Sequence, residues 1–241
     1  MILKPDYGID APGVIRNLLL AAACGVAMAL FAPARLTLGP VQFAVPPTGW
    51  GIGISCGGGG LLMLLYAKLG KFRHRDKMLK LHHWRGDERV LDVGTGRGLL
   101  LIGAARRITT GHATGMDIWN AEDLSGNALE RTEANIACEG VADKCSLTSE
   151  GAQKMSFRDA SFDVVLSNLC LHNIYDRPTR LQACREIARV LKPGGVAILS
   201  DYKHVGEYSR AMREMGLQVE LKAPNLFTTY PPLRILVARK A

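Results

Sequence analysis

The sequence predicts a doubly wound α/β domain that is preceded by a hairpin of two apolar helices. From Arg89 to the end of the chain, short apolar runs typical of buried strands alternate with helix-like segments. Before residue 71, two stretches with few charges are each long enough to cross a bilayer. A glycine-rich turn comes after the first strand, within Leu91–Gly98. A length of 241 residues suits one domain of ordinary size with such an appendage.

The two apolar segments are Val14–Ala32, in which the only polar side chains are Arg16 and Asn17, and Thr48–Ala67, which has no charge. An α-helix rises about 1.5 Å per residue, so about 20 residues cross a ~30 Å hydrocarbon core. We expect residues 1–70 to form a membrane anchor with spans over about 14–32 and 48–67. Small residues recur every fourth position in both segments, which lets helices pack closely in lipid: Ala21, Gly25, Ala29, Gly49, Gly53 and Gly57. The glycine-rich second helix would serve equally to join two copies into a homo-oligomer.

Basic residues flank this hairpin. Residues 68–89 carry eight basic and three acidic side chains, and a basic stretch directly after an apolar span favours an anionic membrane surface over nucleic acid. The positive-inside rule predicts that both termini and the domain are cytoplasmic and that the link Pro33–Pro47 lies outside. After the anchor, we expect a basic juxtamembrane linker over 71–88, with a lead-in helix at Asp76–Trp84, and then a domain over 89–241.

Aromatic side chains support the two spans, since Trp50 and Tyr66 would lie near opposite interfaces. Two alternatives compete with the membrane hairpin. The first segment could be a signal peptide cleaved near Ala32–Ala34, although a second span comes directly after it. Both segments could instead be buried helices of a soluble domain, but each interior glycine costs such a helix about 1 kcal/mol relative to alanine.

The domain is predicted to contain a mostly parallel, seven-stranded sheet. The expected strands are Arg89–Val93, His112–Ile118, Lys144–Thr148, Phe162–Ser167, Val196–Ser200, Leu217–Lys222 and Leu233–Ala238, of which the last two pair as a hairpin. The expected helices are Gly98–Ile108, Gly126–Glu139, Pro178–Leu191 and Val205–Met215. Ligands of such sheets bind at the carboxyl ends of the strands, where the strand order reverses.

The glycine-rich turn reads Gly94-x-Gly96-x-Gly98. Asp92 precedes it, and Asp117 comes 23 residues after Gly94, where a carboxylate can accept hydrogen bonds from both ribose hydroxyls. The third glycine comes one residue earlier than in the dinucleotide fingerprint, and a carboxylate close to a diphosphate would be unfavourable. The cationic sulfonium of S-adenosylmethionine tolerates Asp92 better, so we favour this ligand over NAD.

Four segments in order, Leu91–Gly98, Gly115–Asp117, Phe162–Asn168 and Leu191–Gly195, resemble the successive motifs of class I S-adenosylmethionine-dependent methyltransferases. Within that group the chain is most similar to the ubiquinone/menaquinone-biosynthesis type of domain. The resemblance extends from Asp76 to the end of the chain. It implies a Rossmann-like methyltransferase fold for residues 89–241 and S-adenosylmethionine as the methyl donor.

The resemblance also implies roles for individual residues. The methionine part of the cofactor would be lined by Gly94, Thr95, Gly96 and Gly98, with Asp92 nearby, and Asn168 would lie beside the transferred methyl group. Asp117 would hold the ribose and Ile118 would flank the adenine. The chain departs from the family at Glu150-Gly151-Ala152, because many members have an aspartate that reads the adenine amino group where Gly151 stands. Either Glu150 substitutes from one position earlier, or adenine recognition relies on backbone groups.

Candidate catalytic residues lie after the fourth strand. His172 could serve as a general base toward a hydroxyl or thiol, or could have a structural role. Tyr175 is a second candidate, whereas Cys170 as a nucleophile and Asp201 are weaker ones. The segment lacks the Asn-Pro-Pro-Tyr-like signature of base and amide methyltransferases, so nucleic acid is not expected as a partner. No cysteine or histidine spacing predicts a metal site.

These observations favour a membrane-anchored methyltransferase acting on a small or lipophilic acceptor, such as a quinone precursor, a lipid or an apolar thiol. An NAD-dependent oxidoreductase is one alternative, although it gives no reason for the segment Leu191–Gly195. A non-catalytic, S-adenosylmethionine-binding membrane module is another, because the adenine-reading aspartate is missing. The accepting atom stays open at this stage.

Overall fold

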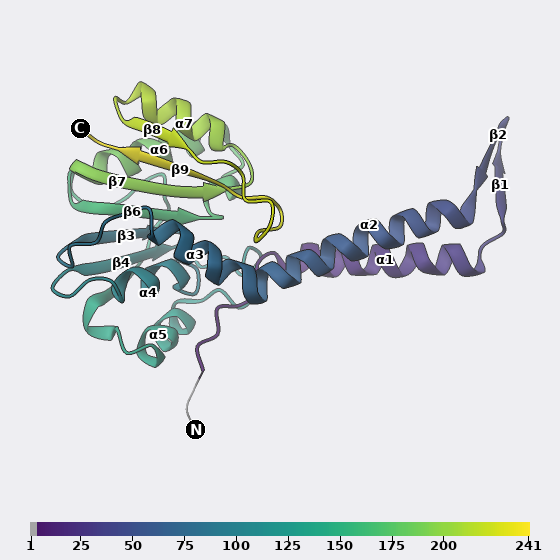
Figure 1. The fold of residues 1–241 in the computed structure, drawn as a ribbon, viewed down its shortest axis with the longest axis horizontal. Coiled ribbons are helices and arrows are strands. Elements are labelled where there is room, and N and C mark those ends of the chain that lie inside the picture. Colours follow the sequence, from purple (N-terminus) through teal and green to yellow (C-terminus); the bar gives the residue numbers. More distant parts are fainter. Residues whose placement is uncertain (1–3) are drawn as a thin grey trace.

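The computed structural model describes residues 4–241 and divides them between a domain and a long helical hairpin that projects from one edge of it (Figure 1). The domain is built on a sheet in the order β5-β4-β3-β6-β7-β9-β8. Its strands are β3 (Arg89–Val93), β4 (His112–Asp117), β5 (Cys145–Ser149), β6 (Phe162–Asn168), β7 (Leu191–Asp201), β8 (Gln218–Leu221) and β9 (Arg234–Arg239). In this sheet β9 is antiparallel to both of its neighbours, β7 and β8, and the other neighbouring pairs are parallel. The predicted seven-stranded, mostly parallel sheet is confirmed.

Helices cover both faces of the sheet. They are α4 (Leu99–Ala105), α5 (Leu129–Cys138), α6 (Arg177–Val190) and α7 (Val205–Glu214), with short 3₁₀ turns at Ala142–Lys144 and Leu171–Asn173. In β6, Val165 packs with α6 and α7 on one face, while Val164 and Leu166 pack with α4 on the other. Because both faces are buried, the central residues of this strand, Val164–Leu166, are all apolar rather than alternating with polar ones.

The hairpin consists of α1 (Pro12–Phe31) and α2 (Val45–Leu65), joined at the far end by the antiparallel pair β1 (Arg35–Leu38) and β2 (Val41–Ala44) (Figure 1). The two helices approach closely at glycines. A β-carbon on Gly49 would lie 2.6 Å from the carbonyl oxygen of Gly25. The predicted small-residue stripe is therefore used for packing within the chain. The strand pair was not foreseen, because its residues were taken as a plain link.

The second helix does not stop where the apolar sequence ends. It continues through a π-helical segment, η1 (Tyr66–Gly70), into α3 (Lys71–Leu79), which packs beside α4. The predicted lead-in helix at Asp76–Trp84 is therefore wrong in both bounds, and the residues given to a linker begin as helix. The physical reason is burial, since His74, Met78 and Leu79 of α3 are covered by the domain.

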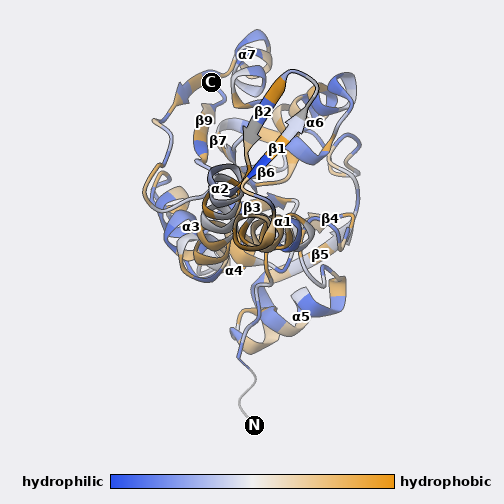
Figure 2. Ribbon diagram, turned by 90° about the vertical axis from the view of Figure 1, so that its right-hand side faces the viewer, coloured by the Kyte–Doolittle hydropathy of each residue, from blue (hydrophilic) through white to orange (hydrophobic). Residues whose placement is uncertain are grey.

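Among the described residues, two helical stretches are long and apolar enough to cross a membrane: Pro12–Phe31, with mean hydropathy 2.0, and Val45–Leu79, with mean hydropathy 1.5. Only 11% and 22% of these windows are buried, unlike the core helix of a soluble domain. Figure 2, which looks along the hairpin, shows apolar and neutral residues on α1 and α2 and many hydrophilic ones on the domain. The prediction that Tyr66 is an interfacial anchor is wrong, because its side chain is 5% exposed and turned into the domain.

Candidate functional site

The glycine-rich turn lies between the end of β3 and the start of α4. Gly94, Gly96 and Gly98 have φ angles of 71°, 52° and 82°, in the left-handed region that favours glycine. The backbone N–H of Gly94 donates to the carbonyl of Met116 in β4 at 2.9 Å. A β-carbon at position 94 would overlap the sulfur of Cys170. The turn therefore needs glycine both for its path and for its close contacts.

Asp92, at the end of β3, stabilises this turn through hydrogen bonds to its side chain. It is buried, and its Oδ2 accepts hydrogen bonds from Thr95 Oγ1 at 2.8 Å and from the backbone N–H of Leu101 at 3.0 Å. Among the described residues no partner hydrogen-bonds its buried Oδ1. Burial raises the pKa of Asp92 to about 7, and the negative charge of Asp117 adds to this effect. Asp92 thus links the turn to the start of α4.

Asp117 ends β4 and joins the next strand to the turn. Its Oδ2 accepts from the backbone N–H of Gly96 at 2.7 Å, and its Oδ1 accepts from the backbone N–H of Trp119 at 2.7 Å. Asn127 Nδ2 also donates to Oδ1 at 3.2 Å, so Oδ2 is the oxygen that can accept a further hydrogen bond. Ile118 comes next in the chain, with 67% of its side chain exposed. A carboxylate beside an exposed apolar side chain suits a ribose with an attached base.

The segment after β5 places Glu150 in a hydrogen-bonded turn. Its carboxylate accepts from Thr148 Oγ1 at 2.9 Å and from the N–H and Oγ of Ser156 at 2.7 and 2.6 Å. These hydrogen bonds lower the pKa of Glu150 against the opposing effect of burial. The side chain is thus held in a local turn. The amide of Gln153, which the sequence did not single out, lies against Gly151, and a β-carbon there would be 2.7 Å from its Nε2.

At the end of β6, the side-chain oxygens of Asn168 and Tyr66 lie near each other. Asn168 Oδ1 and the hydroxyl of Tyr66 are both buried, and the structure gives neither a hydrogen bond of good geometry within residues 4–241. The Tyr66 hydroxyl lies beside the polar side chain of Asn168, and Asp10 and Asp201 are its charged neighbours. Buried polar atoms are usually paired in native proteins, and these two lie next to each other at the end of β6. Sequence reasoning missed Tyr66 at this site because it was assigned to the lipid interface.

His172 and Asp201 form a pair across neighbouring strand ends. His172 Nδ1 lies 2.8 Å from Asp201 Oδ1, and the backbone N–H of His172 donates to Asp201 Oδ2 at 3.1 Å. Tyr202 packs edge-on against the imidazole ring, with 4.7 Å between ring centroids. Nδ1 faces the carboxylate, so Nε2 is the nitrogen left for proton transfer. Tyr175 is different, with 90% of its side chain exposed on the loop before α6.

Cys170 is not suited to act as a nucleophile. Its thiol is buried against Gly94 in the turn, and burial raises its pKa, an effect that Asp117 and Asp201 strengthen. A nucleophilic cysteine needs the thiolate form. The buried thiol is therefore a packing residue of the site.

A segment before α1, residues 6–11, crosses the turn, and we call it the amino-terminal strap. Asp10 pairs as a bridge with Leu124, and Arg97 Nη1 donates to Asp6 Oδ2 at 2.5 Å. Lys71 is 4% exposed and donates to the backbone carbonyl of Tyr7 at 2.7 Å. Lys71 is thus a structural residue and no part of an exposed basic surface. No local sequence pattern signals the strap, because its partners are distant along the chain, as Lys71 is from Tyr7.

The site and the hairpin share one edge of the sheet. Asp10, just before α1, meets the segment after β4, and Tyr66, just after α2, reaches the end of β6. Both contacts are at carboxyl ends of parallel strands, and Figure 1 shows the hairpin leaving from the same side. In residues 4–241 no group of three or more His, Cys, Asp or Glu side chains could hold a metal ion.

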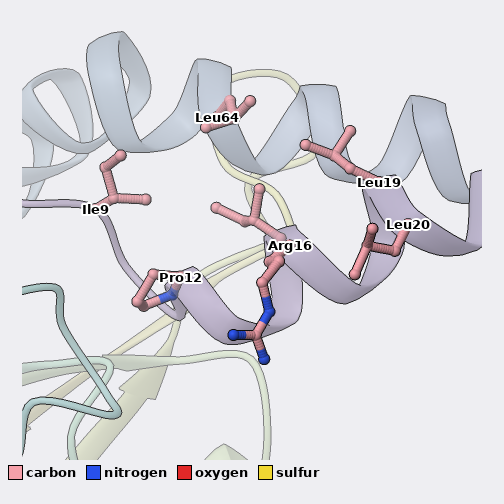
Figure 3. Close-up of a pocket in the computed structure, with 7 residues that line it drawn as sticks. Ile9, Pro12, Arg16, Leu19, Leu20 and Leu64 are labelled. Carbon is pink, nitrogen blue, oxygen red and sulfur yellow. The ribbon is translucent and has the colours of Figure 1, made fainter. Parts of the chain in front are cut away.

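An apolar groove of about 400 Å³ lies where the hairpin meets the strap (Figure 3). It is lined by Ile9, Pro12, Ile15, Arg16, Leu19, Leu20 and Leu64. The guanidinium of Arg16 points away from α2 in this view, so apolar carbon faces the groove between the helices.

Comparisons with known proteins agree with this geometry. Residues 90–195 match the family of methyltransferase domains. An uncharacterized protein of Haemophilus influenzae is 32% identical over 155 residues, which cover 61% of this chain and 59% of that protein. The ubiquinone/menaquinone biosynthesis C-methyltransferase UbiE of Geotalea daltonii is 31% identical over 47% of this chain and 45% of its own length. The chain thus spans about half the length of these curated relatives.

Solved structures share the fold. A SAM-dependent methyltransferase from Aquifex aeolicus superposes with a TM-score of 0.54 at 18% identity, over 68% of this chain and 88% of that one. Together these matches support a class I methyltransferase domain with S-adenosylmethionine as its cofactor. The residues present fit that group, since the turn is built of glycines, Asp117 Oδ2 retains acceptor capacity and Asn168 places a buried polar oxygen at the end of β6.

Proposed function

We propose that this chain is an S-adenosylmethionine-dependent methyltransferase, held at a membrane by α1 and α2 and acting on a small lipophilic acceptor. The observation that carries the proposal is that the carboxyl edge of the sheet, where the motifs meet, faces the base of the apolar hairpin. An acceptor leaving the bilayer beside the hairpin would meet that edge first. A quinone precursor, a lipid or an apolar thiol has the required character, and the groove at the base of α1 offers it an apolar path.

In this proposal the cofactor lies along the strand ends. Its methionine part is lined by Gly94, Thr95, Gly96 and Gly98, with Asp92 shaping the turn beneath, and Asn168 lies beside the methyl group. Asp117 binds the ribose and Ile118 covers one face of the adenine, which fits their positions at the end of β4. Adenine recognition falls to backbone groups of Gly151 and Ala152, because the Glu150 carboxylate is engaged by Ser156.

S-adenosylmethionine, when bound, supplies an activated methyl group. The chain's own residues then have to position the acceptor and remove its proton, and good alignment alone can lower a barrier by several kcal/mol. We assign His172 Nε2 as the general base toward a hydroxyl or thiol, with the Asp201 carboxylate beside Nδ1 orienting the ring. Tyr175 stays a weaker candidate, since its exposed side chain would have to turn toward the site.

The membrane arrangement is based on the hairpin. Because α1 and α2 form an antiparallel hairpin, both ends of the chain lie on one side. The basic residues after the second span favour the cytoplasmic side. Gly49 packs against α1 of the same chain. A homo-oligomer would therefore have to use other small residues of α2, such as Gly51 and Gly58, which face open space.

The test is a search for the product. Membranes from cells lacking the gene are incubated with the purified chain and S-adenosylmethionine carrying a trideuterated methyl group, and organic extracts are searched by mass spectrometry for a labelled compound. We expect a labelled apolar product that the His172→Ala variant forms far more slowly. A folded chain that binds S-adenosylhomocysteine but labels nothing would favour a non-catalytic module. A rise in melting temperature with NAD, and none with S-adenosylhomocysteine, would favour an oxidoreductase.

A further inference from the structure

The loop between β8 and β9, residues 222–233, carries two of the most exposed large apolar side chains of the domain. Leu226 is 67% exposed and Phe227 is 97% exposed. A fully exposed phenylalanine forgoes the favourable burial of its ring. Adjacent exposed apolar side chains at a loop tip therefore indicate a surface that another apolar phase covers.

The loop has a defined structure that presents these two residues. Asn225 Nδ2 donates to Thr228 Oγ1 at 2.5 Å, and the backbone N–H of Thr228 donates back to Asn225 Oδ1 at 3.2 Å. The hydroxyl of Thr229 donates to the carbonyl of Asn225 at 2.6 Å. These bonds close a turn across Leu226 and Phe227, so the two side chains stand at its tip.

The same loop packs against the domain end of the hairpin. A β-carbon on Gly70 would overlap the carbonyl oxygen of Thr228, and a β-carbon on Gly59 would lie 3.4 Å from the Tyr230 hydroxyl. Gly59 belongs to the apolar helix α2 itself. Figure 1 shows this loop beside the junction of α2 and α3. If α2 spans a bilayer, the loop tip lies at the height of the bilayer surface.

We infer that Leu226 and Phe227 form a second membrane contact, with their side chains inserted at the headgroup boundary of the bilayer that holds the hairpin. This inference rests on the proposed membrane anchoring. The bilayer is the occupant that the structure favours because the loop is continuous with the apolar surface of α2 through Gly59. The contact would fix the rotation of the domain about the hairpin. Arg234, which comes just after the loop, lies opposite Asp201 in the register of β9 with β7. The membrane contact would therefore also hold the end of the sheet that carries Asp201 toward the lipid.

Fluorescence quenching by lipids brominated along their acyl chains tests this contact. The full chain is reconstituted in vesicles of phosphatidylcholine and phosphatidylglycerol as the wild type, as Phe227→Trp and as Glu214→Trp. Glu214 is an exposed residue at the end of α7 and serves as the matched control. Trp50 of α2 reports on the anchor, and a Trp50→Phe variant isolates its signal. We expect brominated lipid to remove most of the emission added at position 227 and little of that added at 214.

The outcomes separate the two proposals. Quenching of Trp50 and of the tryptophan at 227 supports the second contact. Quenching of Trp50 alone, with the tryptophan at 227 no more affected than the one at 214, overturns the contact and keeps the anchor. If Trp50 is not quenched either, the anchoring proposal fails and the loop contact fails with it.

Discussion

The substitution Asp92→Asn removes a carboxyl group whose ionisation the fold opposes. Asp92 is 1% exposed, and burial raises its pKa from the ordinary 3.8 to about 7. Asparagine keeps the carbonyl oxygen that can accept from Thr95 and Leu101, but it cannot ionise. The variant therefore isolates the titration of one group from the shape of the turn.

The sign and size of the effect come from proton linkage. Between pH 3.8 and about 7 the folded state binds more protons at Asp92 than the unfolded state does, so the free energy of unfolding falls as pH rises. The contribution is complete below pH 3.8 and lost by about pH 7, where its loss amounts to about 4 kcal/mol. Between pH 5 and pH 8 the loss is about 2.5 kcal/mol. Asparagine also places an amide where Asp92 Oδ1 has no partner, a cost of about 1–3 kcal/mol that does not change with pH.

The assay is denaturant unfolding of the full chain in detergent micelles at several values from pH 5 to pH 8. We expect the variant to gain about 2.5 kcal/mol relative to the wild type across this range. Asp143→Asn, at an exposed position, is the control and should keep a constant difference from the wild type. A constant difference for Asp92→Asn as well would refute the reasoning, because it would mean that Asp92 ionises as it does in water.

Three further predictions concern catalysis, the cofactor and the hairpin. His172→Ala should lower the rate of product formation about 10²- to 10⁴-fold while calorimetric titration with S-adenosylhomocysteine stays unchanged; an unchanged rate would leave His172 with a structural role. Asp117→Ala removes the acceptor of the Gly96 N–H and a ribose contact, so the same titration should show affinity about 10- to 100-fold weaker, and equal affinity would contradict the ribose assignment. Gly49→Leu should destabilise the hairpin by about 1–3 kcal/mol or more, read as a lower melting temperature, because a β-carbon there would be 2.6 Å from the backbone of α1. Gly58→Leu, which meets nothing within 4 Å, should have little effect, and equal loss in both variants would mean that α2 does not pack on α1 as described.

The sheet and the glycine-rich turn could be predicted because their signals are local. The run Val164–Leu166 is apolar on both faces because both faces are covered, and Gly94, Gly96 and Gly98 all adopt positive φ. The position of Asp117 could be inferred from its distance along the chain to this turn. The boundary of α3 could not be predicted in this way, since its helix is stabilised by burial of Met78 and Leu79 under the domain rather than by a sequence pattern.

The rest of the site depends on contacts between distant segments. The partnership of His172 with Asp201 depends on the register of β6 with β7, which places Asn168 opposite Ser200. The strand order predicts that the carboxyl ends of β6 and β7 are neighbours, but it does not predict which side chains are in contact. Tyr66 was misplaced for a similar reason, because an aromatic residue at the end of an apolar helix suits a lipid interface and a protein interior equally well.

The chain enters and leaves the hairpin through the site itself. The amino-terminal strap leads into α1 after crossing the glycine-rich turn, and α2 passes through the segment with Tyr66 before α3 packs on the sheet. Any shift of α1 against α2 would therefore move Asp10 and Tyr66, whose polar groups are electrostatic neighbours. A hairpin that served only to attach the domain could be joined to it by a flexible linker, without contacts at the strand ends. The direct connection instead indicates that the hairpin helps to shape the candidate site, so a domain cut before Lys71 would lose Asp10 and Tyr66 from it.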